Sequence, residues 1–290
     1  MKVCNTFISD VSERKPLLEL ERSIQTTYRK ELWKPFIKAI KEFNLIEEND
    51  KIAVAISGGK DSLILAKLFM ELHKYSDVPF EVEFISMDPG FNSLNRKFLE
   101  DNASYLKIPI KIRESDIFKV AEKIAHENPC YMCARMRRGF LYNFAKELGC
   151  NKLALGHHFD DVIETTMLNI FFGSQFKTMV PKIQAENFEE MELIRPLVFL
   201  KEADIIRFFK SAGINTMNCG CEVAAEKYSS KRAYIKELIK DLKKENPNID
   251  ISIFNSATNV NINQVYGYEF NNEKLKFNDI YLKSVKKDKW

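Results

Sequence analysis

The sequence predicts an α/β protein built on a doubly wound parallel sheet, with a helical segment before it and an extension after it. Short apolar segments rich in β-branched residues alternate with longer segments whose apolar residues recur at helical spacing. Such alternation is typical of a parallel sheet with helices on both faces. Three of the predicted strands run into segments that contain glycine, histidine or acidic residues, namely 57–62, 86–90 and 156–161. Because ligands of open α/β sheets bind beyond the carboxyl ends of the strands, we expect these three segments to share one pocket.

The expected elements follow one another from residue 23 to residue 244. Strands are predicted over 51–56, 81–86, 108–113 and 152–156, and helices over 23–45, 62–75, 94–106, 135–148, 160–172, 201–212 and 231–244. Pro35 is expected to bend or restart the first helix. We divide the chain into an N-terminal arm and helix (1–47, with a polar arm over 1–22), a central domain (48–247) and a C-terminal extension (248–290). The extension is rich in asparagine and aromatic residues, has some strand character and receives no role.

The composition indicates a soluble globular protein, with 45% hydrophobic and 29% charged residues in 290. No apolar run approaches the roughly 20 residues that span a bilayer, and the N-terminus lacks the apolar core of a secretory signal. We therefore expect a cytoplasmic protein without a membrane partner. The net charge of +3 permits nucleic-acid binding without arguing for it. Basic residues cluster at Arg135, Arg137 and Arg138, although such clusters are more often solvated helix faces.

The most informative segment is Ser57-Gly58-Gly59-Lys60-Asp61-Ser62, which lies between a predicted strand and a predicted helix. This arrangement points backbone N–H groups and a helix N-terminus at an anion, and Lys60 adds a mobile positive charge. The spacing differs from that of a Walker loop and from that of a dinucleotide-binding loop. A nucleotide phosphate is the expected occupant. A plain surface turn would leave the Lys-Asp-Ser sequence unexplained.

Two further segments end predicted strands at the same edge. Gly156-His157-His158-Phe159-Asp160-Asp161 brings two imidazoles and two carboxylates to a helix start, with Glu164 one turn later. Carboxylate oxygens at this position suit Mg²⁺ beside phosphates, and an acidic cap of the helix would use the same residues. Asp88 stands in Asp88-Pro89-Gly90, which is also an ordinary turn sequence.

Four of the six cysteines occur as closely spaced pairs, Cys130 with Cys133 and Cys219 with Cys221. Two such pairs can converge on one soft metal centre. The spacing leaves open a closed zinc site on four thiolates and an iron–sulfur cluster on three. It also leaves open a redox-active disulfide pair, or thiols that are simply buried. Cys4 and Cys150 are interpreted as structural.

The loop over 57–62 resembles the PP-loop of the ATP pyrophosphatases, whose fold is the adenine nucleotide α-hydrolase-like sheet. The ordered combination of this loop, the C-x-x-C followed by Ala134-Arg135-Met136-Arg137-Arg138-Gly139, the segment 155–161 and a cysteine near 220 resembles the tRNA 2-thiocytidine synthetase family. Residues 168–173 and 194–197 fit as well. The resemblance covers about residues 30–245.

The resemblance implies ATP-dependent thiolation of a tRNA cytidine, in which the base carbonyl is adenylated and sulfur comes from a 4Fe–4S cluster. It implies ATP and Mg²⁺ as further cofactors, tRNA and a sulfur donor (a cysteine desulfurase or sulfide) as partners, and a homodimer. The implied catalytic residues are Lys60, Asp61 and Asp161. The implied ATP-binding residues are Ser57, Gly58, Gly59, Lys60, Asp61, Ser62, Asp88, Gly156 and His157. The implied metal ligands are Cys130, Cys133 and Cys221 for the cluster (Cys219 being the alternative third ligand) and Asp161 for magnesium, and the implied RNA contacts are Arg135, Arg137 and Arg138.

Three alternatives stay open at this point. The first is a PP-loop ligase that adenylates without inserting sulfur and has a structural zinc. The second is sulfur insertion into another RNA base or a small molecule. The third is a nucleotide-binding module without catalysis.

Overall fold

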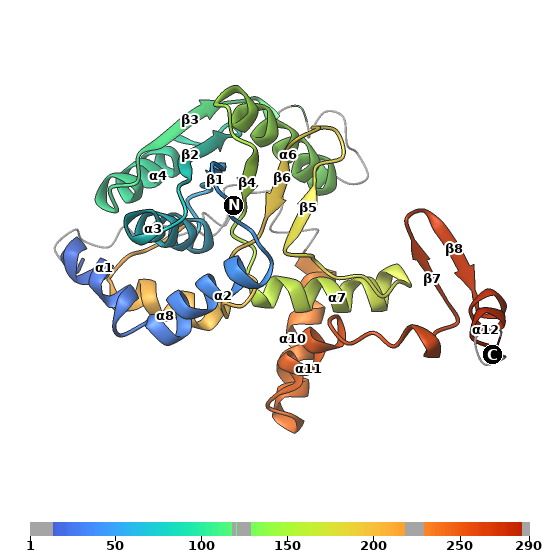
Figure 1. Ribbon diagram of the computed structural model, residues 1–290. Coiled ribbons are helices and arrows are strands. Elements are labelled where there is room, and N and C mark those ends of the chain that lie inside the picture. Colours follow the sequence, from blue (N-terminus) through green and yellow to red (C-terminus); the bar gives the residue numbers. More distant parts are fainter. Residues whose placement is uncertain (1–13, 118–119, 121–128, 218–228, 286–290) are drawn as a thin grey trace.

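The computed structural model describes residues 14–117, 120, 129–217 and 229–285 and shows one six-stranded sheet with helices on both faces (Figure 1). The strand order is β3-β2-β1-β4-β6-β5, and all neighbouring strands are parallel except β5 and β6. Its strands are β1 (Lys51–Ala55), β2 (Glu81–Asp88), β3 (Ile110–Glu114), β4 (Lys152–Ala154), β5 (Lys182–Gln184) and β6 (Glu192–Ile194). The chain starts in the middle of the sheet and winds outwards in both directions, as the sequence predicts.

Side chains of β1 alternate between two hydrophobic cores because successive residues of a strand point to opposite faces. Ile52 and Val54 join the larger core, which contains α3 (Lys60–Tyr75), α4 (Ser93–Tyr105) and α8 (Glu202–Ser211). Ala53 joins the smaller core under α6 (Pro129–Glu147). Helix α3 is buried along most of its length because it lies between the sheet and α8.

The N-terminal region belongs to the larger core. Helix α1 (Leu17–Gln25) begins inside the segment predicted to be a polar arm, because Leu20 and Ile24 lie one turn apart and are both buried. A π-helical turn (Arg29–Trp33) and α2 (Lys34–Glu42) replace the single predicted helix, with Pro35 in the first turn of α2 where its missing N–H costs nothing.

The helices after β4 lie below the sheet in Figure 1. Helix α7 (Phe159–Gly173) follows β4, and α10 (Ser229–Glu245) and α11 (Ile249–Ser256) pack against it. The contact between α7 and α10 is a third apolar cluster that includes Phe159, Ile163 and Ile235. Beyond α11, a 3₁₀ turn (Ile262–Gln264), the hairpin β7 (Gly267–Phe270) and β8 (Glu273–Lys276), and α12 (Phe277–Val285) extend away from the sheet (Figure 1).

Candidate functional site

The loop over 57–62 connects β1 to α3 and is closed by its own hydroxyl groups. Ser62 Oγ accepts a hydrogen bond from Ser57 N at 3.1 Å and donates one to the Gly59 carbonyl at 2.8 Å. Gly59 is the N-cap residue of α3 and has no side chain with which to cap the helix end. Gly58 has φ +82°, a left-handed conformation that glycine adopts without strain. The positive end of the helix dipole and free N–H groups therefore face the loop, which suits an anion.

Lys60 lies between two carboxylates at this helix end. Its Nζ is 3.1 Å from Asp61 Oδ2 and 3.0 Å from Oε1 of Glu202, the first residue of α8. Burial alone would lower the pKa of Lys60, but the two carboxylates outweigh it and raise the pKa. Burial likewise opposes the shift of Glu202, whose hydrogen bonds from Lys236 and Lys60 lower its pKa to about 2. Both groups are charged at neutral pH.

One carboxylate oxygen of Asp61 has no partner among the described residues. Its Oδ1 is buried, makes no hydrogen bond to that part of the chain, and lies 3.7 Å from His158 Nε2. Burial raises the pKa of Asp61 in spite of the nearby His158 and Lys60. A buried oxygen of this kind carries an energetic cost that a cation or a proton donor in the loop would relieve.

The segment over 156–161 packs directly on this loop, so two of the three segments that the sequence places at one edge of the sheet are in contact. A Cβ at Gly156 would approach the Asp61 carbonyl carbon and oxygen to 3.0 Å, so only glycine allows this contact without displacement of the backbone. Helix α7 then begins with a reciprocal cap: His158 N donates to Asp161 Oδ2 at 3.0 Å, and Asp161 N donates to His158 Nδ1 at 3.4 Å. Asp161 is thus part of a helix cap.

Helix α10 supplies two cations to the same site. Arg232 donates to Asp161 Oδ1 at 2.8 Å and to Glu164 Oε2 at 2.7 Å. Lys236 donates to Glu202 Oε2 at 2.6 Å. Lys60, Arg232 and Lys236 are thus each held by carboxylates, and both oxygens of Asp161 are engaged.

His157 and Arg195 each have a buried nitrogen that finds no hydrogen-bond partner within the described part of the chain. These atoms are His157 Nδ1 and Arg195 Nε. Burial lowers the pKa of His157 to about 4, and the positive charges of Arg195 and Arg232 add to this effect. Burial also lowers the pKa of Arg195 to about 10. His157 is therefore neutral at pH 7, while Arg195 keeps its charge.

Asp88 is the last residue of β2, and its carboxylate accepts hydrogen bonds from the loop that follows the strand. Its Oδ1 accepts hydrogen bonds from Gly90 N at 2.9 Å and Phe91 N at 2.7 Å, and its Oδ2 accepts one from Arg96 at 2.7 Å. Burial raises the pKa of Asp88, but these bonds outweigh it and hold the pKa below its ordinary value. These contacts are those of an ordinary turn residue. A position of Asp88 beside a bound nucleotide stays a prediction.

The cysteine pairs lie at or beyond the limits of the described chain. Cys130 and Cys133 fall in the first two turns of α6, which begins earlier than the predicted helix; residues three apart share a helix face. Cys219 and Cys221 lie outside the described residues. The chain before them contacts the loop over 57–62, because Met217 N donates to the Gly58 carbonyl at 3.1 Å. Cys150 is a buried thiol whose pKa is raised by burial to about 11, in keeping with a structural residue.

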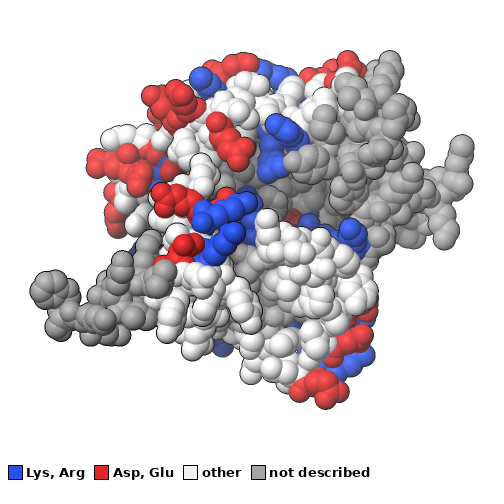
Figure 2. All heavy atoms as spheres, turned by 90° about the vertical axis from the view of Figure 1, so that its right-hand side faces the viewer, with Lys and Arg blue, Asp and Glu red and all other residues white. Residues whose placement is uncertain are grey.

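Several site residues were not predicted as site residues from the sequence, namely Glu202, Arg195, Met217 and the two cations of α10, Arg232 and Lys236. Arg135 and Arg138 are exposed on α6, and Arg137 is half-buried. Within the described residues, no cluster of three or more His, Cys, Asp or Glu side chains has the arrangement of a metal site. Figure 2 shows Lys and Arg side chains around a hollow on the face that lies at the right of Figure 1.

Comparisons with known proteins agree with this architecture. A family model described as a PP-loop domain matches residues 17–240. A tRNA-cytidine(32) 2-sulfurtransferase of Geotalea uraniireducens is 38% identical over 225 residues, which cover 77% of this chain and 88% of that protein. The enzyme of the same name from Bdellovibrio bacteriovorus is 37% identical over 236 residues, 80% of this chain and 89% of that protein.

Among solved structures, the U34-tRNA thiolase NcsA from Methanococcus maripaludis with its 4Fe–4S cluster has the same fold. It matches with a TM-score of 0.60 and 23% identity, over 78% of this chain and 76% of that chain. Within the described part of the chain, every helix is too short or too polar to cross a lipid bilayer. The extent of the family match and the similarity to these full-length relatives place the chain in the PP-loop family, as a member of the group of tRNA-cytidine(32) 2-sulfurtransferases.

Proposed function

We propose that this protein is an ATP-dependent tRNA sulfurtransferase that converts a cytidine to 2-thiocytidine. The observation that carries the proposal is the contact between Gly58 and Met217, which brings the chain that leads to Cys219 and Cys221 onto the phosphate loop. Nucleotide activation and sulfur delivery need adjacent sites, and this contact supports their proximity. The names of the relatives supply the substrate, a tRNA cytidine.

ATP fits the loop over 57–62 on electrostatic grounds. The open N-terminus of α3 and the charged Lys60 favour phosphate oxygens. ATP phosphates must compete with Glu202 for Lys60, so nucleotide binding would release Glu202 to Lys236. Magnesium is assigned to the carboxylates of this site. The unpartnered oxygen of Asp61 fits a cation directly, whereas Asp161 would have to exchange Arg232 for the metal.

The 4Fe–4S cluster is assigned to Cys130 and Cys133, with Cys221 as third ligand and Cys219 as the alternative. The donor set fits, because thiolates are the usual ligands of such clusters and residues 130 and 133 share one helix face. When bound, a cluster on three cysteines supplies an open iron that can hold the sulfur to be transferred. Arg135, Arg137 and Arg138 follow on the same helix and are proposed to contact the tRNA backbone.

The reaction balances without a redox step when sulfide is the sulfur source. The O2 atom of the cytosine forms a bond to the α-phosphorus of ATP, and the bond to pyrophosphate breaks. Sulfide then forms a bond to C2, and the C2–O bond breaks, so that AMP leaves with the former base oxygen. Lys60 and the loop N–H groups hold the phosphates in place and stabilise their developing charge. If a cysteine desulfurase is the sulfur donor, the sulfur arrives as a persulfide, and a thiol reductant must supply two electrons to release it as sulfide. A homodimeric assembly belongs to this proposal as well.

The test is an anaerobic assay with protein reconstituted with iron and sulfide, an unmodified tRNA transcript, ATP and Mg²⁺. We expect AMP, pyrophosphate and 2-thiocytidine in equal amounts, with the nucleoside measured by mass spectrometry. Lys60→Ala should abolish all three products and leave the iron content unchanged. Lys74→Ala, at the far end of α3 and exposed, is the matched control and should behave as wild type. AMP formation without a thiolated nucleoside would refute the proposal in favour of an adenylating ligase.

A further inference from the structure

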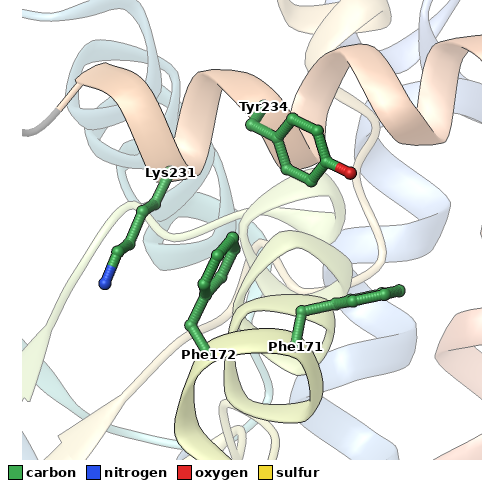
Figure 3. A pocket seen from close by; sticks show the side chains of 4 residues that line it. All are labelled: Phe171, Phe172, Lys231 and Tyr234. Atoms are coloured by element: carbon green, nitrogen blue, oxygen red, sulfur yellow. The ribbon is translucent and has the colours of Figure 1, made fainter.

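A surface outside the phosphate loop combines three exposed aromatic rings with a lysine. Phe171 and Phe172 lie at the end of α7, and Lys231 and Tyr234 lie on α10; together they line an open cavity of about 390 Å³ (Figure 3). We call these four residues the aromatic platform. Phe172 points between Lys231 and Tyr234, with its ring 6.2 Å from that of Tyr234 and 5.1 Å from Lys231 Nζ.

The platform is not part of the core. The exposed fractions are 53% for Phe171, 46% for Phe172 and 55% for Tyr234. Neighbouring aromatic side chains with this exposure usually mark a contact surface. Among the described residues, no carboxylate pairs with Lys231, and none lines the cavity. The cation is therefore available to a phosphate, and the rings are available to flat apolar groups.

These two chemical properties fit single-stranded RNA better than an apolar protein face. Unpaired bases stack on aromatic side chains, and lysines beside the rings contact the backbone phosphates. A surface that docks a protein partner would more often lack a lysine without a carboxylate partner beside its rings, because burial of an unpaired lysine is costly. The lysine and the exposed aromatic side chains together thus favour single-stranded RNA as the occupant.

The same two helices connect the platform to the proposed catalytic site. Helix α7 carries Asp161 at its start and Phe172 near its end, a separation of about 17 Å along the axis. Helix α10 presents Arg232 to Asp161 and Tyr234 to Phe172. A stacked strand covers about 17 Å with about five nucleotides. An RNA strand with its target base at the loop can therefore reach the platform with bases close in sequence to the target.

We propose that the aromatic platform stacks unpaired bases of the tRNA a few nucleotides from the modified cytidine. This inference rests on the proposed function and adds the surface that holds the substrate. It assigns no role to the platform in ATP binding or sulfur transfer.

The test measures the affinity of the protein for an unmodified tRNA transcript by fluorescence anisotropy, without ATP. Phe172→Ala and Tyr234→Ala should each weaken binding by about 5- to 150-fold, the range for loss of one stacked base. Tyr234→Phe keeps the ring and should bind as wild type. Lys231→Gln should reduce the salt dependence by about one phosphate contact. Tyr75→Ala, 70% exposed at the end of α3, is the matched control and should change nothing.

A fully paired RNA duplex of similar length separates stacking from charge. Its bases cannot stack on the platform, so Phe172→Ala and wild type should bind it equally. Wild-type affinity of both alanine variants for the tRNA would overturn the inference and leave the proposed function intact. A change of oligomeric state with unchanged tRNA affinity would overturn it in favour of a contact between proteins. A wild-type protein with no affinity for tRNA would overturn the inference and the proposed function together.

Discussion

The contact between Gly58 and Met217 can be tested with a pair of substitutions. Gly58 has φ +82°, and a Cβ at this position would approach Met217 Sδ to 2.6 Å. Alanine in a left-handed conformation costs roughly 1–2 kcal/mol. Overpacking against a buried neighbour adds about 1–3 kcal/mol, even though the flexible methionine can move. Gly58→Ala should therefore lower the free energy of unfolding by about 2–5 kcal/mol.

Met217→Ala separates the two contributions. Alone, it should lower the free energy of unfolding by about 2–5 kcal/mol, because Met217 is buried. In the double variant the overlap with the sulfur is gone, whereas the backbone strain and the tight approach to Leu99 Cδ1 at 3.3 Å remain. The double variant should therefore be about 1–3 kcal/mol more stable than the sum of the single losses predicts.

Equilibrium urea unfolding of the four proteins measures this coupling. Gly139→Ala is the control, because a Cβ there meets no atom within 4 Å and the position is helical; it should raise stability by up to about 1 kcal/mol. Losses that add to within about 0.5 kcal/mol would show that Met217 does not pack on Gly58. The link between the phosphate loop and the cysteine segment would then be refuted.

Further predictions concern buried charges and the cysteines. Glu21→Gln should destabilise the protein by about 3–5 kcal/mol at pH 7, because Lys67 would stay buried without its partner, and chemical denaturation measures this. Burial raises the pKa of Glu21, but Lys67 outweighs it and holds the pKa below its ordinary 4.5. The difference in unfolding free energy between wild type and Glu21→Gln should therefore be complete above pH 4.5 and vanish as the pH falls through the lower pKa of the folded protein. A difference that does not change with pH would contradict the ion pair. Lys236→Gln should raise the pKa of Glu202 from about 2, measured by carbon NMR of the carboxyl group; an unchanged value would refute their hydrogen bond. Cys130→Ala should abolish iron binding while ATP affinity is kept, and a full iron content in this variant would remove Cys130 from the ligands.

The central part of the fold could be predicted from the sequence because its elements are long and strongly patterned. Helix α3 and strand β1 differ from their predicted bounds by only one or two residues. Strands β5 and β6 were missed because three residues are too few to show alternation. Helix α1 was missed because a single buried face, Leu20 with Ile24, is hard to distinguish in a polar segment.

The location of the candidate site could be predicted, but its ion pairs could not. Strand ends and a glycine loop identify one edge of the sheet from local sequence alone. The partners of Lys60 and Asp161 come from α8 and α10, which are distant in sequence and reach the site only because these helices pack on α3 and α7. Glu202 and Arg232 have no local signal, since an acidic first turn or a basic helix face is common on any helix.

The most direct test of the account follows one oxygen atom. A tRNA transcript with ¹⁸O at O2 of the target cytidine is incubated with the reconstituted protein, ATP and sulfide, and the AMP is analysed by mass spectrometry. If the base carbonyl attacks the α-phosphorus in the site formed by Lys60 and the loop, each AMP should carry one ¹⁸O. Unlabelled AMP formed together with 2-thiocytidine would contradict adenylation of the base and with it the central claim.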